Sequence, residues 1–155
     1  MRKYCLSLLL LLLTLVSNAV EPPKREIRGV WLTTVYGLDW PRKPATTETG
    51  RKAQQRDVCD ILDRLQDANF NTVFLQVRMR GDVIWRSAIE PASKTFSGKY
   101  GMMPGYDPLA FVVDECHKRG MECHAWFVTF PLGTDKSVKE QGKLSVVRRQ
   151  PKLCK

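Results

Sequence analysis

The sequence predicts an α/β fold, the amino-terminal three β/α units of a (β/α)8 TIM barrel, truncated before the barrel closes. Strand-like and helix-like segments alternate along the chain, which predicts right-handed parallel crossovers. The second predicted strand, over residues 72–77, is almost continuously apolar, as expected for a parallel strand covered on both faces. The 155 residues also fall short of the roughly 250 that a closed barrel needs. A doubly wound sheet satisfies the same alternation, but no Gly-rich phosphate turn follows the first strand.

The first unit is a strand over residues 27–34 followed, after a loop, by a helix from about Arg51 to Ala68. The strand segment is short, apolar and rich in residues that favour β structure. In the helical segment, apolar residues recur at the spacing of one helix face: Val58, Ile61, Leu62 and Leu65.

The second unit has a strand over 72–77, a long loop over 78–106, and the clearest helix start in the chain. Asp107 can accept hydrogen bonds from free backbone N–H groups, and Pro108 fits the first helical position because its missing donor costs nothing there. Gly120 predicts the end of this helix. A third strand is expected over residues 122–128.

The amino terminus has the pattern of a signal peptide over residues 1–19. Arg2 and Lys3 precede an apolar run from Leu6 to Val16, and small residues lead up to Ala19. A membrane-spanning helix needs about 20 apolar residues, so this run predicts no stable membrane anchor. We therefore expect cleavage near Ala19, an exported protein in the periplasm or outside the cell, and a linker over residues 20–26.

The net charge of +9 comes mainly from the end of the chain. Residues 135–155 carry seven basic and two acidic side chains, whereas residues 27–134 form the predicted partial barrel domain. A basic segment can face an anionic envelope polymer or a nucleic acid. No aromatic residue is interleaved with these charges for base stacking, so we predict no nucleic-acid partner and interpret the segment as a solvated face or the truncated start of the next unit.

The cysteines predict neither a metal site nor an organic cofactor. Four remain after residue 19, an even number that permits disulfides in an exported protein: Cys59, Cys116, Cys123 and Cys154. The first three lie in predicted helix stripes or a strand, where small buried side chains explain them better. No pair or Cys/His cluster has zinc-site spacing.

The candidate substrate-binding residues lie where the predicted strands end. In parallel α/β folds these ends carry the functional loops. Tyr36 and Arg80 lie in such loops. Aromatic rings can cover the apolar faces of a sugar, and Asp and Arg side chains can bind its hydroxyls or charged groups. This pattern predicts a sugar site, with candidate substrate-binding residues Asp39, Trp40, Arg78, Asp82, Trp85, His124 and Trp126.

Each candidate also has a structural interpretation. Asp39 and Asp82 can contact substrate or cap their loops. Arg78 can bind a substrate carboxylate, such as a muramic lactyl group, or pair with a carboxylate of the barrel. His124 fits an interior histidine better than a general base. Trp31 and Trp126 fit packing better than sugar stacking, whereas Trp40 and Trp85 favour stacking because they are in loops.

Four ordered motifs over residues 26–134 resemble the amino-terminal half of the glycosyl-hydrolase-like 10 family, which is distinct from the family-10 xylanases. The matching segments are Ile27–Trp31 with Asp39–Pro41, Phe74–Arg78 with Gly81–Asp82, Pro104–Leu109, and His117–Gly120 with His124–Trp126. The resemblance implies a secreted or envelope-associated bacterial barrel with a glycosidase role and peptidoglycan glycan strands as a substrate. Members of the family continue past residue 155.

The expected chemistry limits what these residues can do alone. Glycoside hydrolysis normally uses two carboxyl groups, about 5 to 5.5 Å apart for retention and about 6.5 to 9.5 Å apart for inversion. In barrel glycosidases these groups lie on later strands, so we expect the catalytic pair to be absent from this chain and the fragment to be inactive by itself. The function predicted is a glycoside hydrolase acting on an envelope or other polysaccharide; the alternative is a non-catalytic glycan-binding envelope module.

Overall fold

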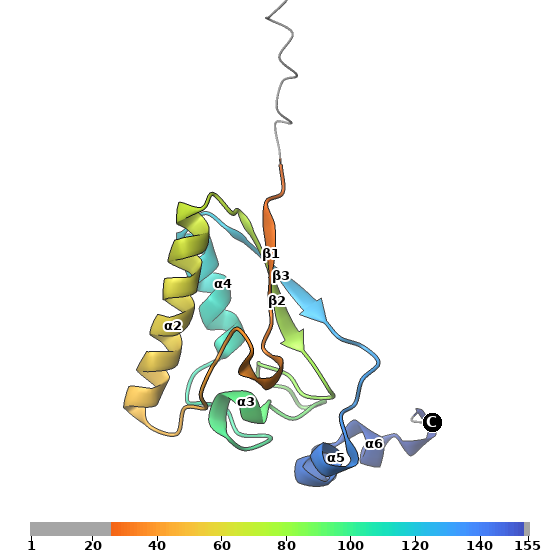
Figure 1. Cartoon of the computed structure of the whole chain (residues 1–155). Coiled ribbons are helices and arrows are strands. Elements are labelled where there is room, and N and C mark those ends of the chain that lie inside the picture. The colour runs from red at the N-terminus through yellow and green to blue at the C-terminus, as the bar shows by residue number, and fades with distance from the viewer. Residues whose placement is uncertain (1–25, 154–155) are drawn as a thin grey trace, which may run out of the picture.

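The computed structural model describes residues 26–153 and has an α/β fold built on a three-stranded parallel sheet. The strands are β1 (Gly29–Leu32), β2 (Thr72–Arg78) and β3 (Glu122–Phe127), in the order β1-β2-β3. Helices α2 (Glu48–Asp67) and α4 (Pro108–Lys118) connect successive strands and lie on the same side of the sheet (Figure 1). The predicted α/β class is confirmed, while closure into a barrel stays a prediction.

The core lies between the sheet and these two helices. Val73, Leu75 and Val77 alternate along β2 and are fully buried. They belong to one apolar cluster with Leu62 of α2 and Val112 of α4. Since side chains alternate across a strand, every second residue of β2 faces this helix layer.

The opposite face of the sheet carries aromatic side chains. Trp31, Phe74 and His124 occupy one register row across the three strands. The Trp31 ring stacks on Phe74 with centroids 4.7 Å apart, and Trp126 meets Trp31 edge-on at 5.1 Å. Trp31 is nevertheless 59% exposed. The expectation that both faces of the second strand are covered fits β2, whose residues are all buried or half-buried, whereas Trp31 of β1 lies on a side of the sheet that α2 and α4 do not cover.

The helix ends follow their capping residues. Thr47 accepts a hydrogen bond from the Gly50 backbone N–H, so α2 begins at Glu48, three residues before the predicted Arg51. The start of α4 is confirmed: the Asp107 carboxylate accepts from the Ala110 N–H, and Pro108 is the first helical residue.

The loops after β1 and β2 are themselves folded. The loop after β1 contains a short 3-10 turn, η1 (Val35–Gly37), and the loop after β2 contains α3 (Lys94–Ser97). Isolated bridges join Val83 to Arg78 and to Ala92. Val83 and Phe96 are buried, so the second loop has an apolar interior that its sequence pattern did not predict.

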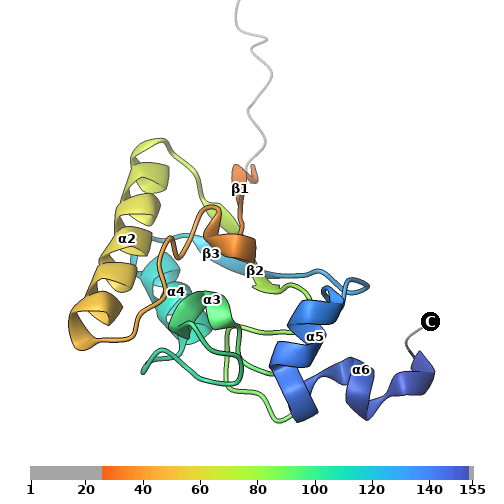
Figure 2. The same ribbon diagram turned by 60° about the horizontal axis from the view of Figure 1, so that its bottom comes forward.

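The basic segment after β3 also folds. It forms α5 (Asp135–Gln141), η2 (Gly142–Leu144), α6 (Val146–Arg149) and η3 (Pro151–Leu153). Figures 1 and 2 place α5 beyond the ends of the strand arrows, with α6 further out, whereas α2 and α4 lie beside the sheet. α5 is therefore positioned with the loops at the carboxyl ends of the strands.

The predicted signal peptide and Cys154 lie outside the described residues. Within residues 26–153, no helix combines the length and the apolar character needed to cross a membrane.

Candidate functional site

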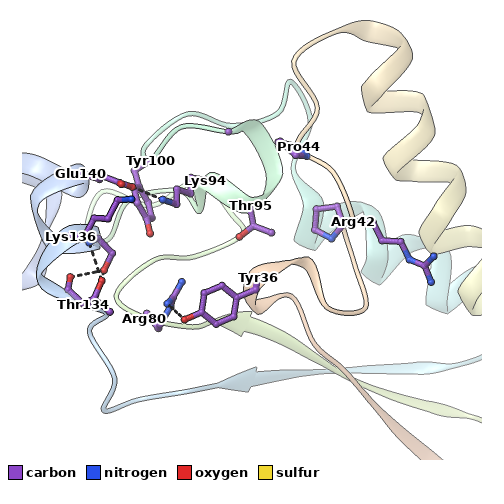
Figure 3. Close-up of a pocket in the computed structure, with 13 residues that line it drawn as sticks. Tyr36, Arg42, Pro44, Arg80, Lys94, Thr95, Tyr100, Thr134, Lys136 and Glu140 are labelled. Atoms are coloured by element: carbon purple, nitrogen blue, oxygen red, sulfur yellow. Dashed lines mark hydrogen bonds and ion pairs between the residues drawn. The ribbon is translucent and has the colours of Figure 1, made fainter.

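A pocket of about 530 Å³ lies at the carboxyl ends of the strands, the edge where parallel α/β folds place their functional loops. Loops that follow all three strands line it (Figure 3). Tyr36 comes from the loop after β1 and Arg80, Lys94 and Tyr100 from the loop after β2; the part after β3 adds Thr134, Lys136 and Glu140. The volume is within the range of about 300–1,000 Å³ that is usual for small-molecule sites.

A buried glutamine positions the Tyr36 side of the pocket. The Gln76 side-chain carbonyl accepts hydrogen bonds from the backbone N–H of Thr34 at 2.9 Å and of Val35 at 2.8 Å. The Thr34 hydroxyl returns a bond to the Gln76 backbone carbonyl at 2.8 Å. Tyr36 then adopts a left-handed backbone conformation, with φ of 56°, and its side chain is 71% exposed. The polar residue inside β2 thus fixes the turn that presents the tyrosine.

Arg80 packs directly on this tyrosine. Its guanidinium carbon lies 4.2 Å from the Tyr36 ring centroid, and its Nη1 donates a hydrogen bond to the Tyr36 hydroxyl. The Arg80 backbone is held by the Asp82 carboxylate, which accepts from its N–H at 3.1 Å, and by the Gln141 side-chain amide of α5, which donates to its carbonyl at 3.3 Å. The arginine is therefore fixed by contacts from three loops.

Lys94, Tyr100 and Glu140 form the opposite side of the pocket (Figure 3). Lys94 makes an ion pair with Glu140, and its ammonium lies 5.1 Å from the Tyr100 ring centroid. The hydrogen bond between them lowers the pKa of Glu140 and raises the pKa of Lys94. Burial, followed by the nearby Asp82 charge, raises the pKa of Tyr100. At neutral pH, Glu140 is thus an anion held by a lysine and not a proton donor.

Arg78 and Asp82 have structural partners. Arg78 forms a two-bond ion pair with Glu90, with contacts of 2.6 and 2.7 Å, and its Nη1 donates to the Val128 and Thr129 carbonyls. Both side chains of the pair are nearly buried. Of the two interpretations of Arg78, the structure matches pairing with a protein carboxylate. Asp82 is 3% exposed and caps its own loop through the Arg80 N–H.

Trp40 lies in the core, which corrects the expectation that it stacks on a sugar. Its side chain is fully buried, meets Phe96 edge-on at 4.9 Å, and donates from Nε1 to the Gln54 carbonyl at 2.7 Å. Its loop position suggested exposure, but this loop folds back over α2. Asp39 is exposed and accepts hydrogen bonds from the Thr33 N–H at 2.8 Å and hydroxyl at 2.6 Å, so it caps the turn after β1.

The other candidates lie apart from the pocket. Trp85 is half-buried, packs edge-on to Phe127 at 5.9 Å and lines a separate cavity of about 450 Å³. His124 and Trp126 lie on the open face of the sheet, where His124 Nε2 is 3.0 Å from a Glu122 carboxylate oxygen. Whether these three contact substrate stays a prediction.

Within the described part of the chain, no cluster of three or more His, Cys, Asp or Glu side chains could hold a metal ion. Cys59, Cys116 and Cys123 are free thiols, and Cys116 is buried in the apolar cluster. Cys123 packs against that cluster, and the neighbouring Cys123 thiol together with burial raises the pKa of Cys116. The small-hydrophobe interpretation fits Cys116 and Cys123 well.

Comparison with known proteins places this arrangement in a family. The family model Glycosyl hydrolase-like 10 matches residues 26–154. The chain belongs to the glycosyl hydrolase-like 10 family. It is 50% identical over 111 residues to Glycosyl hydrolase DigH of Escherichia coli (strain K12), a match that covers 69% of this chain and 25% of the relative. It is 41% identical over 103 residues to Glycosyl hydrolase YngK of Bacillus subtilis (strain 168), covering 66% and 20%. The chain thus spans about a quarter or less of these two relatives.

None of the seven candidates lines the pocket at the carboxyl ends of the strands in this glycosyl hydrolase-like 10 chain. Tyr36 and Arg80 were predicted to lie in loops but were not among the candidates, and Lys136 was predicted only as part of the basic segment. Lys94 and Tyr100 were not predicted. Tyr36 and Arg80 are 44 residues apart in the sequence, so local spacing gave no signal of their contact. The one available signal was that both residues directly follow predicted strands.

Proposed function

We propose that this chain is the substrate-binding part of a glycoside hydrolase acting on a bacterial envelope or other polysaccharide, with peptidoglycan glycan strands as the first substrate to test. The observation that supports this most is the pocket at the carboxyl ends of the strands, which loops from all three strands line. Family membership supports the reaction class. Tyrosine rings and cationic side chains in one pocket suit a polar ligand that has both apolar faces and acceptor oxygens.

We further propose that the catalytic carboxyl groups are not among the described residues. Two carboxyl groups at a defined separation are needed for glycoside hydrolysis. Among the described residues, Glu140 is the one carboxylate that lines the pocket, and it is paired with Lys94. Asp39 and Asp82 bind backbone N–H groups of their own loops. We therefore propose that the described residues bind and orient the sugar.

The proposed place of action is the periplasm or the cell exterior. It is supported by the signal-peptide pattern of residues 1–19, and an envelope polysaccharide is accessible there.

The alternative is a glycan-binding envelope module without catalysis. The same observation favours it: a pocket with one carboxylate, held in an ion pair, can bind a sugar but cannot supply an acid and a base. The two functions differ in whether a catalytic carboxyl pair acts on the sugar that this pocket holds.

The test is co-sedimentation of the full chain with purified peptidoglycan sacculi, followed by measurement of reducing ends released into the supernatant. Retention supports a glycan-binding pocket, which both functions share. New reducing ends would favour the hydrolase and would contradict the proposal that the catalytic carboxyl groups are not among the described residues. Tyr36→Ala, which removes an exposed ring from the pocket, is expected to weaken retention; Lys52→Gln on the exposed side of α2 is its control. Absence of retention, or equal retention of both variants, would contradict the proposal.

A further inference from the structure

The pocket has more positive charge than its own carboxylate can neutralise. Arg80, Lys94 and Lys136 line it together with Glu140. Glu140 pairs with Lys94, and the charge of Lys136 also contributes to lowering its pKa. One carboxylate therefore interacts with both lysines. Among the described residues, no carboxylate lies within ion-pair distance of Arg80. Arg80 and Lys94 both come from the loop after β2, and Figure 3 shows them on different sides of the pocket.

Arg80 is held in a way that leaves hydrogen-bonding capacity unused. One Nη1 hydrogen bond goes to the neutral Tyr36 hydroxyl, and the ring face of Tyr36 covers one side of the guanidinium. The Arg80 Nε is buried and has no hydrogen-bond partner among the described residues. The Arg80 Nη2 also makes no hydrogen bond to the described residues and, unlike Nε, it is not buried. Nη2 is therefore the donor that a ligand in the pocket can reach, and the half-buried guanidinium charge has no carboxylate partner among the described residues.

An oxyanion best matches the free Nη2 donor and the unpaired charge of Arg80. A guanidinium binds a carboxylate through two parallel N–H···O bonds, with geometry that a hydroxyl or an amide carbonyl cannot reproduce. Arg80 is pre-positioned for this by the Tyr36 ring and by the backbone bonds from Asp82 and Gln141. A fixed arginine loses less side-chain entropy when it binds a ligand.

We propose that this pocket binds the carboxylate of an acidic sugar residue, with Arg80 as the principal contact and Lys136 and Lys94 as supporting charges. The inference rests on the proposed glycan function and narrows its substrate class to acidic glycans. It also places the carboxylate contact, one of the two roles predicted for Arg78, on a different arginine. Arg78 is unavailable because Glu90 and two backbone carbonyls already use its donors.

The test compares two sugars that differ in the carboxylate. N-acetylmuramic acid carries a lactyl carboxylate, and N-acetylglucosamine is the same amino sugar without it. Binding of each to the full chain is measured by NMR titration at low salt. We expect tighter binding of the acid, and a loss of about 10- to 100-fold in its affinity for Arg80→Gln, because one charge-assisted pair is removed. Added salt is expected to weaken binding of the acid more than that of the neutral sugar.

Two further variants separate the site from general charge and from misfolding. Arg80→Lys keeps the charge but loses the guanidinium geometry, and is expected to bind the acid with intermediate affinity. Arg42→Gln is the matched control, since Arg42 lines the same pocket but its side chain extends away from Arg80, toward α2, in Figure 3. Circular dichroism of each variant verifies that it is folded.

The inference is overturned if the chain binds the two sugars with equal affinity. It is also overturned if Arg80→Gln and Arg42→Gln lose equal affinity for N-acetylmuramic acid. Either result leaves the proposed glycan function in place. Acetate or inorganic phosphate binding as tightly as N-acetylmuramic acid also overturns it, since the pocket would then be an anion site without sugar recognition. The co-sedimentation assay with sacculi tests the proposed glycan function separately.

Discussion

Replacing Trp40 distinguishes a core residue from a sugar platform. The side chain is fully buried, and a buried tryptophan removes about 150–250 Å² from water, worth about 4 to 6 kcal/mol at about 25 cal/mol per Å². Because extended-chain areas overstate burial, and measured Trp→Ala changes in cores cost about 3–5 kcal/mol, we expect Trp40→Ala to lower the free energy of unfolding by about 3 to 5 kcal/mol.

Trp40→Phe gives a finer test of the same contact. It keeps an aromatic ring beside Phe96 but removes the N–H that donates to the Gln54 carbonyl. We expect it to lower the free energy of unfolding by about 1 to 2 kcal/mol. Urea unfolding of the full chain, followed by circular dichroism at 222 nm, measures both variants without relying on indole fluorescence. Trp31→Ala is the control: this ring is 59% exposed and should cost about 1 kcal/mol or less.

The outcome that refutes the core assignment is an unchanged urea midpoint for Trp40→Ala together with weaker retention on sacculi. A loss for Trp31→Ala as large as that for Trp40→Ala would also refute it, since the difference in burial would then have no energetic consequence.

Three further predictions concern an ion pair, a titrating group and a glycine. Glu90→Gln should destabilise the chain by about 3 kcal/mol in urea unfolding because it leaves Arg78 nearly buried without its counter-charge; a cost below about 1 kcal/mol would contradict this. Hydrogen bonds from Lys118 and Arg119 lower the pKa of Glu115 from 4.5 to about 2, so its stabilisation is present above pH 4.5 and is lost as the pH falls toward 2. Glu115→Gln should therefore flatten the acid side of a pH–stability curve, and an unaltered curve would disprove the role. Gly133→Ala, at φ of +95° with an added Cβ 2.2 Å from the Ser137 hydroxyl, should displace α5 and speed amide hydrogen exchange over residues 134–141; unchanged exchange would argue against it.

The pattern of local signals predicted the elements of the fold well. Asp107 followed by Pro108 marked the start of α4 to the residue, and the apolar runs located all three strands. Elements that depend on distant partners were missed. α3 is a single turn whose Phe96 packs on Trp40, a partner more than fifty residues earlier in the chain, so no local periodicity marked it.

Residue type alone did not predict which side chains line the pocket, because that depends on their position in the fold. Loop tryptophans and strand-end charges were sound candidates, yet Trp40 is in the core and Arg78 is fully paired. Lys136 and Glu140 belong to a segment whose sequence has only the pattern of a basic surface. They reach the pocket because α5 lies across the loop of Arg80, where Gln141 binds the Arg80 carbonyl.

The sequence by itself determined the α/β class, the order of strands and helices, the capping of α4 and the family of the chain, because each of these depends on neighbouring residues or on ordered motifs. The tertiary structure alone decided which charged side chains are paired and which one keeps an unused donor. Those outcomes depend on contacts between loops that follow different strands. The energy of an ion pair or a buried N–H is set by its partners in space, and no spacing along the chain records them.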